Sequence, residues 1–267
     1  MTAMRQVRGV AHVHSTYSFD GRLTLRELAA FFTKHGIQFV LMSEHVESLN
    51  PEKLARFIAD CNECSSNSLL LIPGIEIDNL NALFYGVNQV LSWTDSEDLA
   101  RQLAAGGSVV AVSHPVKVKE DIPQLTRSLV EGVEIWNSRH DGKLAPNNDV
   151  IQFWRSLRSR LERPLLPLCG IDFHSQHDFT PLVFELDCAH LDRDNVIAAV
   201  RAGHYRIVRG RKTVPLDFAT GKLPFVYHLY SQAYRYTYKA IYTIYHAALR
   251  VDFWVPKGLK SRLRRIF

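Results

Sequence analysis

Residues 7–14 read VRGVAHVH and are followed at 15–21 by the polar stretch STYSFDG. The apolar run predicts a buried strand close to the N-terminus. Because alternate side chains of a strand point to the same face, His12 and His14 at its end are expected to share one side. Neutral imidazole binds Zn, Mn and Fe. The pair therefore indicates a metal site, although a half-buried strand that exposes two histidines would show the same pattern.

Strand-like and helix-like segments alternate along the next 190 or so residues. Further apolar runs of strand length lie at 39–44, 69–76, 109–114, 133–136, 166–172 and 182–186. Helical patterns lie between several of them, at 25–35, 51–64, 98–105, 149–161 and 195–202. Thr24 and Glu27 form a capping-box pattern at the start of the first helix. This alternation predicts an α/β domain with a mostly parallel sheet, either open or closed as a barrel.

Potential metal ligands lie at or just past the ends of these predicted strands. In β/α barrels the C-terminal ends of the strands form the rim where catalytic residues meet. A mixture of imidazoles and carboxylates suits Zn, Mn or Fe, and structural zinc would need only four ligands. The larger number here predicts a catalytic site with more than one ion. The candidates are His12, His14, Asp20, His45, Glu76, His114, Asp172 and His174.

Five motifs, in order along the chain, resemble the metal-binding motifs of the PHP (polymerase and histidinol phosphatase) family. They are HVHSTYSFDG (12–21), SEHVE (43–47), PGIEI (73–77), SHP (113–115) and GIDFHS (170–175). The resemblance covers roughly residues 8–210, and the ordered set is more specific than any single motif. It implies a distorted seven-stranded β/α barrel that binds two or three divalent ions (Zn, Mn or Fe) at its C-terminal rim.

The resemblance also implies how the ligands are shared among the ions. His12 and His14 would hold a first ion, with Glu76 and Asp172 completing its ligands. Glu76 would bridge to a second ion held by His114, and Asp20, His45 and His174 would hold a third.

Two positions depart from the family pattern. Glu44 precedes His45 where the family usually has Asp, a change that should be tolerable because His45 is the matching ligand. Many members supply a further ligand to the second ion after the strand at 133–136, where this chain has Asn137 and then Ser-Arg-His-Asp. A two-ion site, or a weakly held second ion, therefore stays open.

The predicted site indicates metal-dependent hydrolysis of a phosphate ester by a metal-activated hydroxide. Asp172 or His174 would act as the catalytic group that relays protons. Arg139 and Lys143 are the predicted phosphate-binding residues, with Lys117 and Lys119 as further rim candidates, because an anionic substrate needs positive side chains. The alternative is that each of these is a solvated loop charge.

Composition places the chain among soluble proteins. Of its residues 46% are hydrophobic and 22% are charged, and the four cysteines show no disulfide spacing, which predicts a reducing, cytoplasmic location. We expect no secretory signal and no transmembrane helix, because no apolar run reaches roughly 18 residues. The net charge of +5 is uneven. Nine basic residues and one acid follow residue 221, so the preceding part is mildly acidic.

The segment 222–267 differs from the rest and predicts a tyrosine-rich helix with a basic tail, appended to a barrel at 1–221. Seven of the ten tyrosines lie there, and one helical face is predicted to be apolar. That face is formed by Leu229, Ala233, Tyr236, Ala240, Ile244, Ala247, Val251 and Trp254. The helix could pack over the barrel, lie on an anionic membrane surface or contact nucleic acid.

The sequence thus predicts a phosphoesterase that acts on a small phosphorylated metabolite or nucleotide. One alternative is an exonuclease-type phosphodiesterase acting on nucleic-acid ends, although the acidic body argues against a long phosphate-binding groove. Another is a non-catalytic domain of the same fold, tethered through its basic tail. The presence of all eight candidate ligands disfavours the latter.

Overall fold

The computed structural model describes residues 5–118 and 121–250. Its strands are β1 (Arg5–Val13), β2 (Phe39–Met42), β3 (Glu44–His45), β4 (Leu70–Ile72), β5 (Gly74–Ile77), β6 (Ala82–Tyr85), β7 (Val109–Val112), β8 (Gly132–Asn137), β9 (Leu166–Gly170), β10 (Leu182–Cys188), β11 (Tyr205–Arg209) and β12 (Lys212–Thr213). They form two six-stranded sheets, ordered β12-β11-β10-β1-β2-β4 and β3-β5-β6-β7-β8-β9.

The two sheets are connected in a way that is consistent with a distorted barrel. A single residue separates β2 from β3 and β4 from β5, so this parallel strand pairing continues from one sheet into the other. On the other side, Ile171 N, just after β9, donates to Ala11 O of β1 at 3.0 Å. An isolated parallel bridge pairs Val13 with Phe173 beside it. The end of β1 therefore lies next to the segment that follows β9.

The sheets are mixed, whereas the sequence pattern predicts mostly parallel pairing. The unpredicted strand β6 runs antiparallel to β5 and β7, and β10 runs antiparallel to β1 and β11. A short 3-10 turn (Asp78–Leu80) and Asn81, with a φ of 49°, link β5 to β6. So short a link can only reverse the chain, because a parallel return needs a crossover of about a dozen residues.

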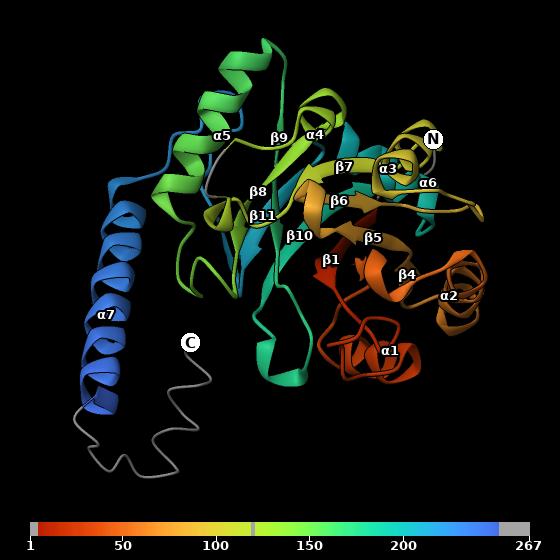
Figure 1. Cartoon of the computed structure of the whole chain (residues 1–267), viewed down its shortest axis with the longest axis horizontal. Helices are drawn as coiled ribbons and strands as arrows, with labels where there is room; N and C mark the ends of the chain where they lie inside the picture. Colours follow the sequence, from red (N-terminus) through yellow and green to blue (C-terminus); the bar gives the residue numbers. More distant parts are fainter. Residues whose placement is uncertain (1–4, 119–120, 251–267) are drawn as a thin grey trace.

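Six of the helices that the structure describes lie around the outside of the sheets (Figure 1). They are α1 (Leu25–Lys34), α2 (Pro51–Cys64), α3 (Ser96–Ala105), α4 (Gln124–Leu129), α5 (Asn148–Leu161) and α6 (Arg193–Arg201). The capping box of Thr24 and Glu27 is present at α1, as predicted. Five of the six match predicted helical segments, and α4 is the short one that the pattern does not reveal. The inner faces of the helices and both sheets bury one apolar core, which holds the strand ends in place.

A seventh helix, α7 (Phe225–Arg250), extends beside the sheets, with its start near α5 (Figure 1). There Asn148 N donates to the buried hydroxyl of Ser231 at 3.2 Å. Leu229 and Tyr236, on the predicted apolar face, are 48% and 73% exposed. The described part of that face is therefore not packed on the sheets. Val251, Trp254 and the basic cluster at 257–265 lie outside the described residues.

Within the described residues, none of the helices has both the length and the apolar character needed to cross a membrane.

Candidate metal centre

All eight predicted ligands lie together at one end of the strands. They come from the end of β1 and the residue after it (His12, His14), the following loop (Asp20), β3 (His45), β5 (Glu76), the segment after β7 (His114) and the segment after β9 (Asp172, His174). Asp20 is half-buried and the other seven are buried. Among the described residues, four overlapping groups of side chains could each hold a metal ion. Within each group, the ligand atoms lie within 4.8 Å of one another.

The geometry at the end of β1 differs from the regular strand that the sequence pattern predicts. The register of β1 with β2 shifts between Ala11 and Val13, and His12 between them has a φ of 63°. A bulge, and not regular pleating, therefore orients His12 and His14. Both imidazoles still face the same carboxylate, because their Nε2 atoms lie 3.1 and 3.5 Å from Glu76 Oε2.

Backbone strain is concentrated at the ligands. Besides His12, both His114 and Asp172 have positive φ values, of 21° and 48°. Non-glycine residues adopt such angles at a cost of about 1–3 kcal/mol each and retain them where the surrounding structure over-determines them. The strained backbone at His12, His114 and Asp172 thus sets the direction in which these three side chains leave the strand ends.

Glu76 lies between His114 on one side and the pair His12 and His14 on the other, with one oxygen toward each side. Its Oε2 faces His12 and His14, and its Oε1 lies 3.0 Å from His114 Nε2. Asp172 Oδ1 lies 3.8 Å from Nε2 of both His12 and His14. This arrangement is the one that a bridging carboxylate requires.

Asp20 lies close to two further histidines, His45 and His174. Its Oδ2 lies 2.8 Å from His174 Nε2, and its Oδ1 lies 3.6 Å from His45 Nε2. The rings of His14 and His174 stack at 4.2 Å between centroids, which connects this group to the first. The three residues that the resemblance assigns to a third ion are therefore neighbours in space.

Two further ligand candidates were not among the predicted eight. Asp78 Oδ2 lies 3.5 Å from His45 Nδ1, and Asp78 groups with His45 and Glu76. His140 Nε2 lies 2.7 Å from Asp172 Oδ2. Asp78 follows Glu76 by two residues, so the PGIEID spacing could have indicated it. The position of His140 depends on the turn after β8, which the sequence pattern does not specify.

Glu134 is a buried carboxylate that supports two ligands. Its Oε1 lies 2.9 Å from His12 Nδ1, and its Oε2 accepts from His114 N at 2.8 Å and from Asn137 Nδ2 at 3.0 Å. Gly170 makes room for it, because a Cβ at that position would lie 1.9 Å from Glu134 Oε1. The contact fixes which nitrogen of His12 faces the centre.

The two residues that depart from the family motifs, Glu44 and Asn137, both form hydrogen bonds in the structure. Glu44 is buried and accepts hydrogen bonds from Ser15 N at 2.9 Å, Ser15 Oγ at 2.6 Å and Ser18 Oγ at 2.5 Å, so it holds the loop that carries Asp20. Asn137 uses its Oδ1 to accept from Arg139 N at 3.0 Å, within the turn after β8. Asn137 therefore serves that turn, and His140 is the nearby side chain that reaches the ligand cluster.

Burial and neighbouring charges shift the pKa values of the candidate ligands in opposite directions. Burial lowers the pKa of His14 well below its usual range. Burial acts on His12 in the same sense, but Glu134, Glu76 and Asp172 together raise the pKa of His12 above its usual range. Burial opposes ionisation of Glu76, yet His12 beside it holds the pKa of Glu76 well below its usual range. Ionised carboxylates in so buried a position favour a compensating positive charge.

Unpartnered polar atoms show that the donor set fits divalent cations. Nearly all buried polar groups in folded proteins form hydrogen bonds. Among the described residues, the buried side-chain atoms without a hydrogen-bond partner include four in this cluster. They are His14 Nε2, Asp20 Oδ1, His45 Nδ1 and His114 Nδ1. Metal coordination would satisfy such imidazole nitrogens and carboxylate oxygens together.

A cavity of about 400 Å³ opens over the cluster and is lined partly by cationic side chains. Arg139 and Lys117 both line it, and Arg139 Nη1 donates to Asp172 O at 3.2 Å and contacts His174 Nδ1. Lys143 is exposed and is not among the described residues that line the cavity, so its role in substrate binding stays a prediction. Lys119 lies outside the described residues.

We expect the purified chain to bind at least two divalent ions. The candidate ligands exceed one coordination sphere, and Glu76 presents its two oxygens to different histidines. Elemental analysis after loading with Mn²⁺ or Zn²⁺ and removal of free metal measures the ratio. A ratio of one ion or less per chain would contradict the expectation.

No protein-family model matches the sequence, and no curated protein matches it significantly.

Solved structures do match the fold. A two-domain protein from Bacteroides vulgatus that contains a predicted PHP-like metal-dependent phosphoesterase matches with a TM-score of 0.59 and 15% identity, over 80% of this chain and 67% of that one. PsfC from Pseudomonas syringae matches with a TM-score of 0.50 and 12% identity, over 86% of this chain and 99% of that one. An amidohydrolase from Chromobacterium violaceum matches with a TM-score of 0.46 and 13% identity, over 75% of this chain and 97% of that one. At such identities, the first two matches establish likeness of fold alone, and the first confirms the PHP resemblance at that level.

Proposed function

We propose that this PHP-like fold carries a metal-dependent phosphoesterase that hydrolyses the phosphate ester of a small phosphorylated metabolite or nucleotide. The observation that supports the proposal most is the convergence of the eight ligand candidates beneath a cavity with cationic side chains. The volume of about 400 Å³ is suited to a small molecule or a single nucleotide.

The PHP resemblance, together with the distances between ligand atoms, indicates which residues would hold the ions. His12, His14, Glu76 and Asp172 would hold one, and His114 with Glu76 a second. Asp20, His45 and His174 would hold a third, and Zn, Mn or Fe would suit these donors. When bound, such ions acidify water and neutralise charge on phosphate oxygens.

The residues of the chain itself would bind the substrate and move protons. Arg139 can engage two phosphate oxygens with its planar guanidinium, and Lys117 adds a second positive charge on the cavity wall. Asp172 Oδ2, 2.7 Å from His140 Nε2, forms with it a pair able to hold a proton for the leaving oxygen. His174 would be the alternative relay, as the sequence predicts.

The non-phosphate part of the substrate would meet Phe19 at the mouth of the cavity. This ring lines the cavity, stacks on His45 at 4.9 Å between centroids, and is 71% exposed. An exposed aromatic face supplies apolar contact to a base, sugar or other organic group.

A substrate screen tests the proposal against its alternatives. The chain, loaded with Mn²⁺ or Zn²⁺, is assayed with phosphomonoesters, phosphodiesters and oligonucleotides. We expect turnover of small phosphomonoesters or nucleotides. Preference for oligonucleotide ends would instead identify an exonuclease, and no turnover with any metal would favour a non-catalytic domain tethered through its tail.

Replacing Arg139 with Ala should weaken substrate binding while leaving the metal content unchanged. We expect kcat/KM to fall about tenfold or more, because charge-assisted hydrogen bonds contribute about 1.5–3 kcal/mol. Steady-state kinetics and elemental analysis of Arg139→Ala measure both effects. Lys143→Ala in parallel tests the other predicted residue. An unchanged kcat/KM in Arg139→Ala would exclude the assignment of Arg139.

We also propose that residues 222–267 contact an anionic membrane surface, ahead of nucleic acid as the partner. Val226, Leu229, Tyr230 and Tyr236 present exposed apolar and aromatic groups on α7, and basic residues dominate the remainder of the segment. Tyrosine and basic residues are favoured at the membrane interface. The protein would then be cytoplasmic and reversibly membrane-associated.

Substituting Leu229 and Tyr236 together with Ser should reduce co-sedimentation of the full chain with anionic liposomes. We expect apparent affinity to fall about tenfold or more, because burying one such side chain contributes about 1.5–3 kcal/mol. Val90→Ser, which removes another exposed apolar side chain, is the matched control. Equal sedimentation of the wild type and the double variant would rule out the membrane contact through this face.

A further inference from the structure

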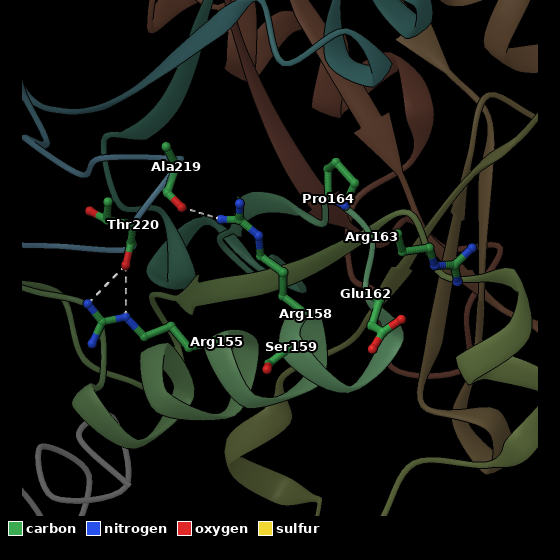
Figure 2. Close-up of a pocket in the computed structure, with 8 residues that line it drawn as sticks. All are labelled: Arg155, Arg158, Ser159, Glu162, Arg163, Pro164, Ala219 and Thr220. Carbon is green, nitrogen blue, oxygen red and sulfur yellow. Dashed lines mark hydrogen bonds between the residues drawn. The ribbon is translucent and has the colours of Figure 1, made fainter.

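A second cavity, of about 450 Å³, lies at the opposite end of β9 from the metal centre. Pro164, which lines this cavity, precedes β9, whereas Asp172 of the metal centre follows it. At about 3.3 Å per residue, the intervening chain spans roughly 25 Å. The end of α5 and the Ala219–Thr220 turn form the walls of the second cavity (Figure 2). The cavity is therefore separate from the cluster of metal ligands.

Two arginines dominate the charge of this cavity. Figure 2 shows Arg155 and Arg158 of α5 with their guanidinium groups directed toward Ala219 and Thr220. Arg155 Nε and Nη2 donate to Thr220 O at 3.0 and 2.9 Å, and Arg158 Nη1 donates to Ala219 O at 2.5 Å. A carbonyl oxygen carries no net charge, so these bonds hold the guanidinium groups in place without neutralising them.

The positive charges lack compensating acids. Within residues 5–118 and 121–250, no carboxylate forms an ion pair with Arg155 or Arg158, whereas Arg160 on the same helix pairs with Asp121 at 3.1 Å. Asp217, the acid nearest in sequence to the Ala219–Thr220 turn, forms hydrogen bonds within that turn and not with the two arginines. Its Oδ1 accepts from Ala219 N at 2.8 Å and from Thr220 N at 3.3 Å.

The other charged residues at the cavity are placed differently. Arg163 points away from the two guanidinium groups in Figure 2, and its Nη2 donates to Arg127 O at 2.9 Å. Glu162 is exposed at the end of α5 and would repel an anion. The side chains that could bind an anion here are therefore those of Arg155 and Arg158, and the negative charge of Glu162 would weaken that binding.

We propose that this cavity, the arginine pocket, is a second site for a phosphate group, held by Arg155 and Arg158. Like charges three residues apart on a helix repel each other, and a dianion between them relieves that repulsion. Each guanidinium has five N–H donors, and the carbonyl contacts leave donors on both free for phosphate oxygens. Because the carbonyls already fix both side chains, little rotamer freedom is lost on binding.

Equilibrium dialysis of the full chain with radiolabelled inorganic phosphate tests the proposal. We expect a site that persists when metal is removed with a chelator and that persists in Arg139→Gln. In Arg158→Gln its affinity should fall about tenfold or more, the loss expected for charge-assisted hydrogen bonds. Arg160→Gln, on the same helix but paired with Asp121, is the matched control and should bind as the wild type does. Unchanged phosphate binding in Arg158→Gln would overturn the proposal.

A structural role alone for these arginines, clamping the turn that leads to α7, predicts a different result. It predicts a lower unfolding midpoint for Arg158→Gln and no phosphate site in the wild type. Glu162→Gln keeps both arginines and removes a repelling charge, so it should tighten phosphate binding. Binding that is unchanged or weaker in Glu162→Gln would also count against the site, even if Arg158→Gln fails to fold.

The phosphate could come from a dissolved molecule or from a lipid headgroup. Phosphatidylglycerol vesicles that retain the wild type but not Arg158→Gln would identify a headgroup. Phosphate binding that depends on Arg158, without vesicle binding that depends on it, would identify a soluble phosphate compound.

Discussion

Asp172→Asn is expected to abolish turnover while the fold persists. Asp172 is 3% exposed, and its two oxygens face different groups, with Oδ1 3.8 Å from His12 and His14 and Oδ2 2.7 Å from His140. Asn keeps the shape of the side chain and removes the negative charge that faces His12, His14 and His140. We expect kcat to fall by about 10³-fold or more, as when a principal electrostatic group of an active site is removed.

The measurement is kcat on the best substrate from the screen, together with circular dichroism and metal content. Asp121→Asn is the control, because Asp121 pairs with Arg127 and Arg160 and is not part of the ligand groups. Retention of more than about a tenth of wild-type kcat in Asp172→Asn would show that Asp172 is not needed. His12→Ala is a poorer test, because it would leave the buried Glu134 without its imidazole partner.

Glu134→Gln should weaken metal binding although Glu134 is not in any of the ligand groups. Glu134 accepts through both oxygens, from the His12 side and from His114 N. A glutamine offers one acceptor and one donor, so one of these contacts becomes a donor facing a donor. Loss of such an orienting contact typically reduces metal affinity or activity 10- to 100-fold.

Competition with a chelator of known affinity measures this effect independently of catalysis. Glu131→Gln is the matched control: Glu131 lies just before β8 and pairs with Arg201 at 2.7 Å on the surface. If metal affinity in Glu134→Gln equals that of the control, the contact with His12 does not tune the centre. A lowered affinity together with wild-type kcat at saturating metal would assign Glu134 to positioning alone.

Several features of the fold follow from local sequence chemistry. The predicted helix at 51–64 has the bounds of α2, in which Asn50 caps the N-terminus and Pro51 fits the first turn. The apolar runs that end in polar side chains are strands, because their side chains are buried in one core. Strand ends that share an edge bring their last residues together, and this is why ligand candidates more than 150 residues apart could be grouped before any geometry was known.

Other features depend on contacts that no local pattern encodes. The sequence pattern does not reveal β6, because four apolar residues carry too little periodicity and its partners come from elsewhere in the chain. No local pattern distinguishes Glu134 from other acids on strands, because its contact with His12 depends on the space that Gly170 leaves on the neighbouring strand. His140 reaches Asp172 only because Asn137 shapes the turn after β8.

The sequence by itself determined eight of the ligand candidates, since their type and order are given by HVHSTYSFDG, SEHVE, PGIEI, SHP and GIDFHS. Only the tertiary structure decided how those ligands face one another. The bulge at His12 and the placement of Glu76 between His114 and the pair His12 and His14 arise from packing between distant segments. The exposure of Leu229 and Tyr236 on α7 reflects the lack of such packing. Local propensity fixes which residues stand at the end of a strand. Long-range steric and hydrogen-bond contacts fix where each side chain points, because they alone over-determine strained backbone such as that of Asp172.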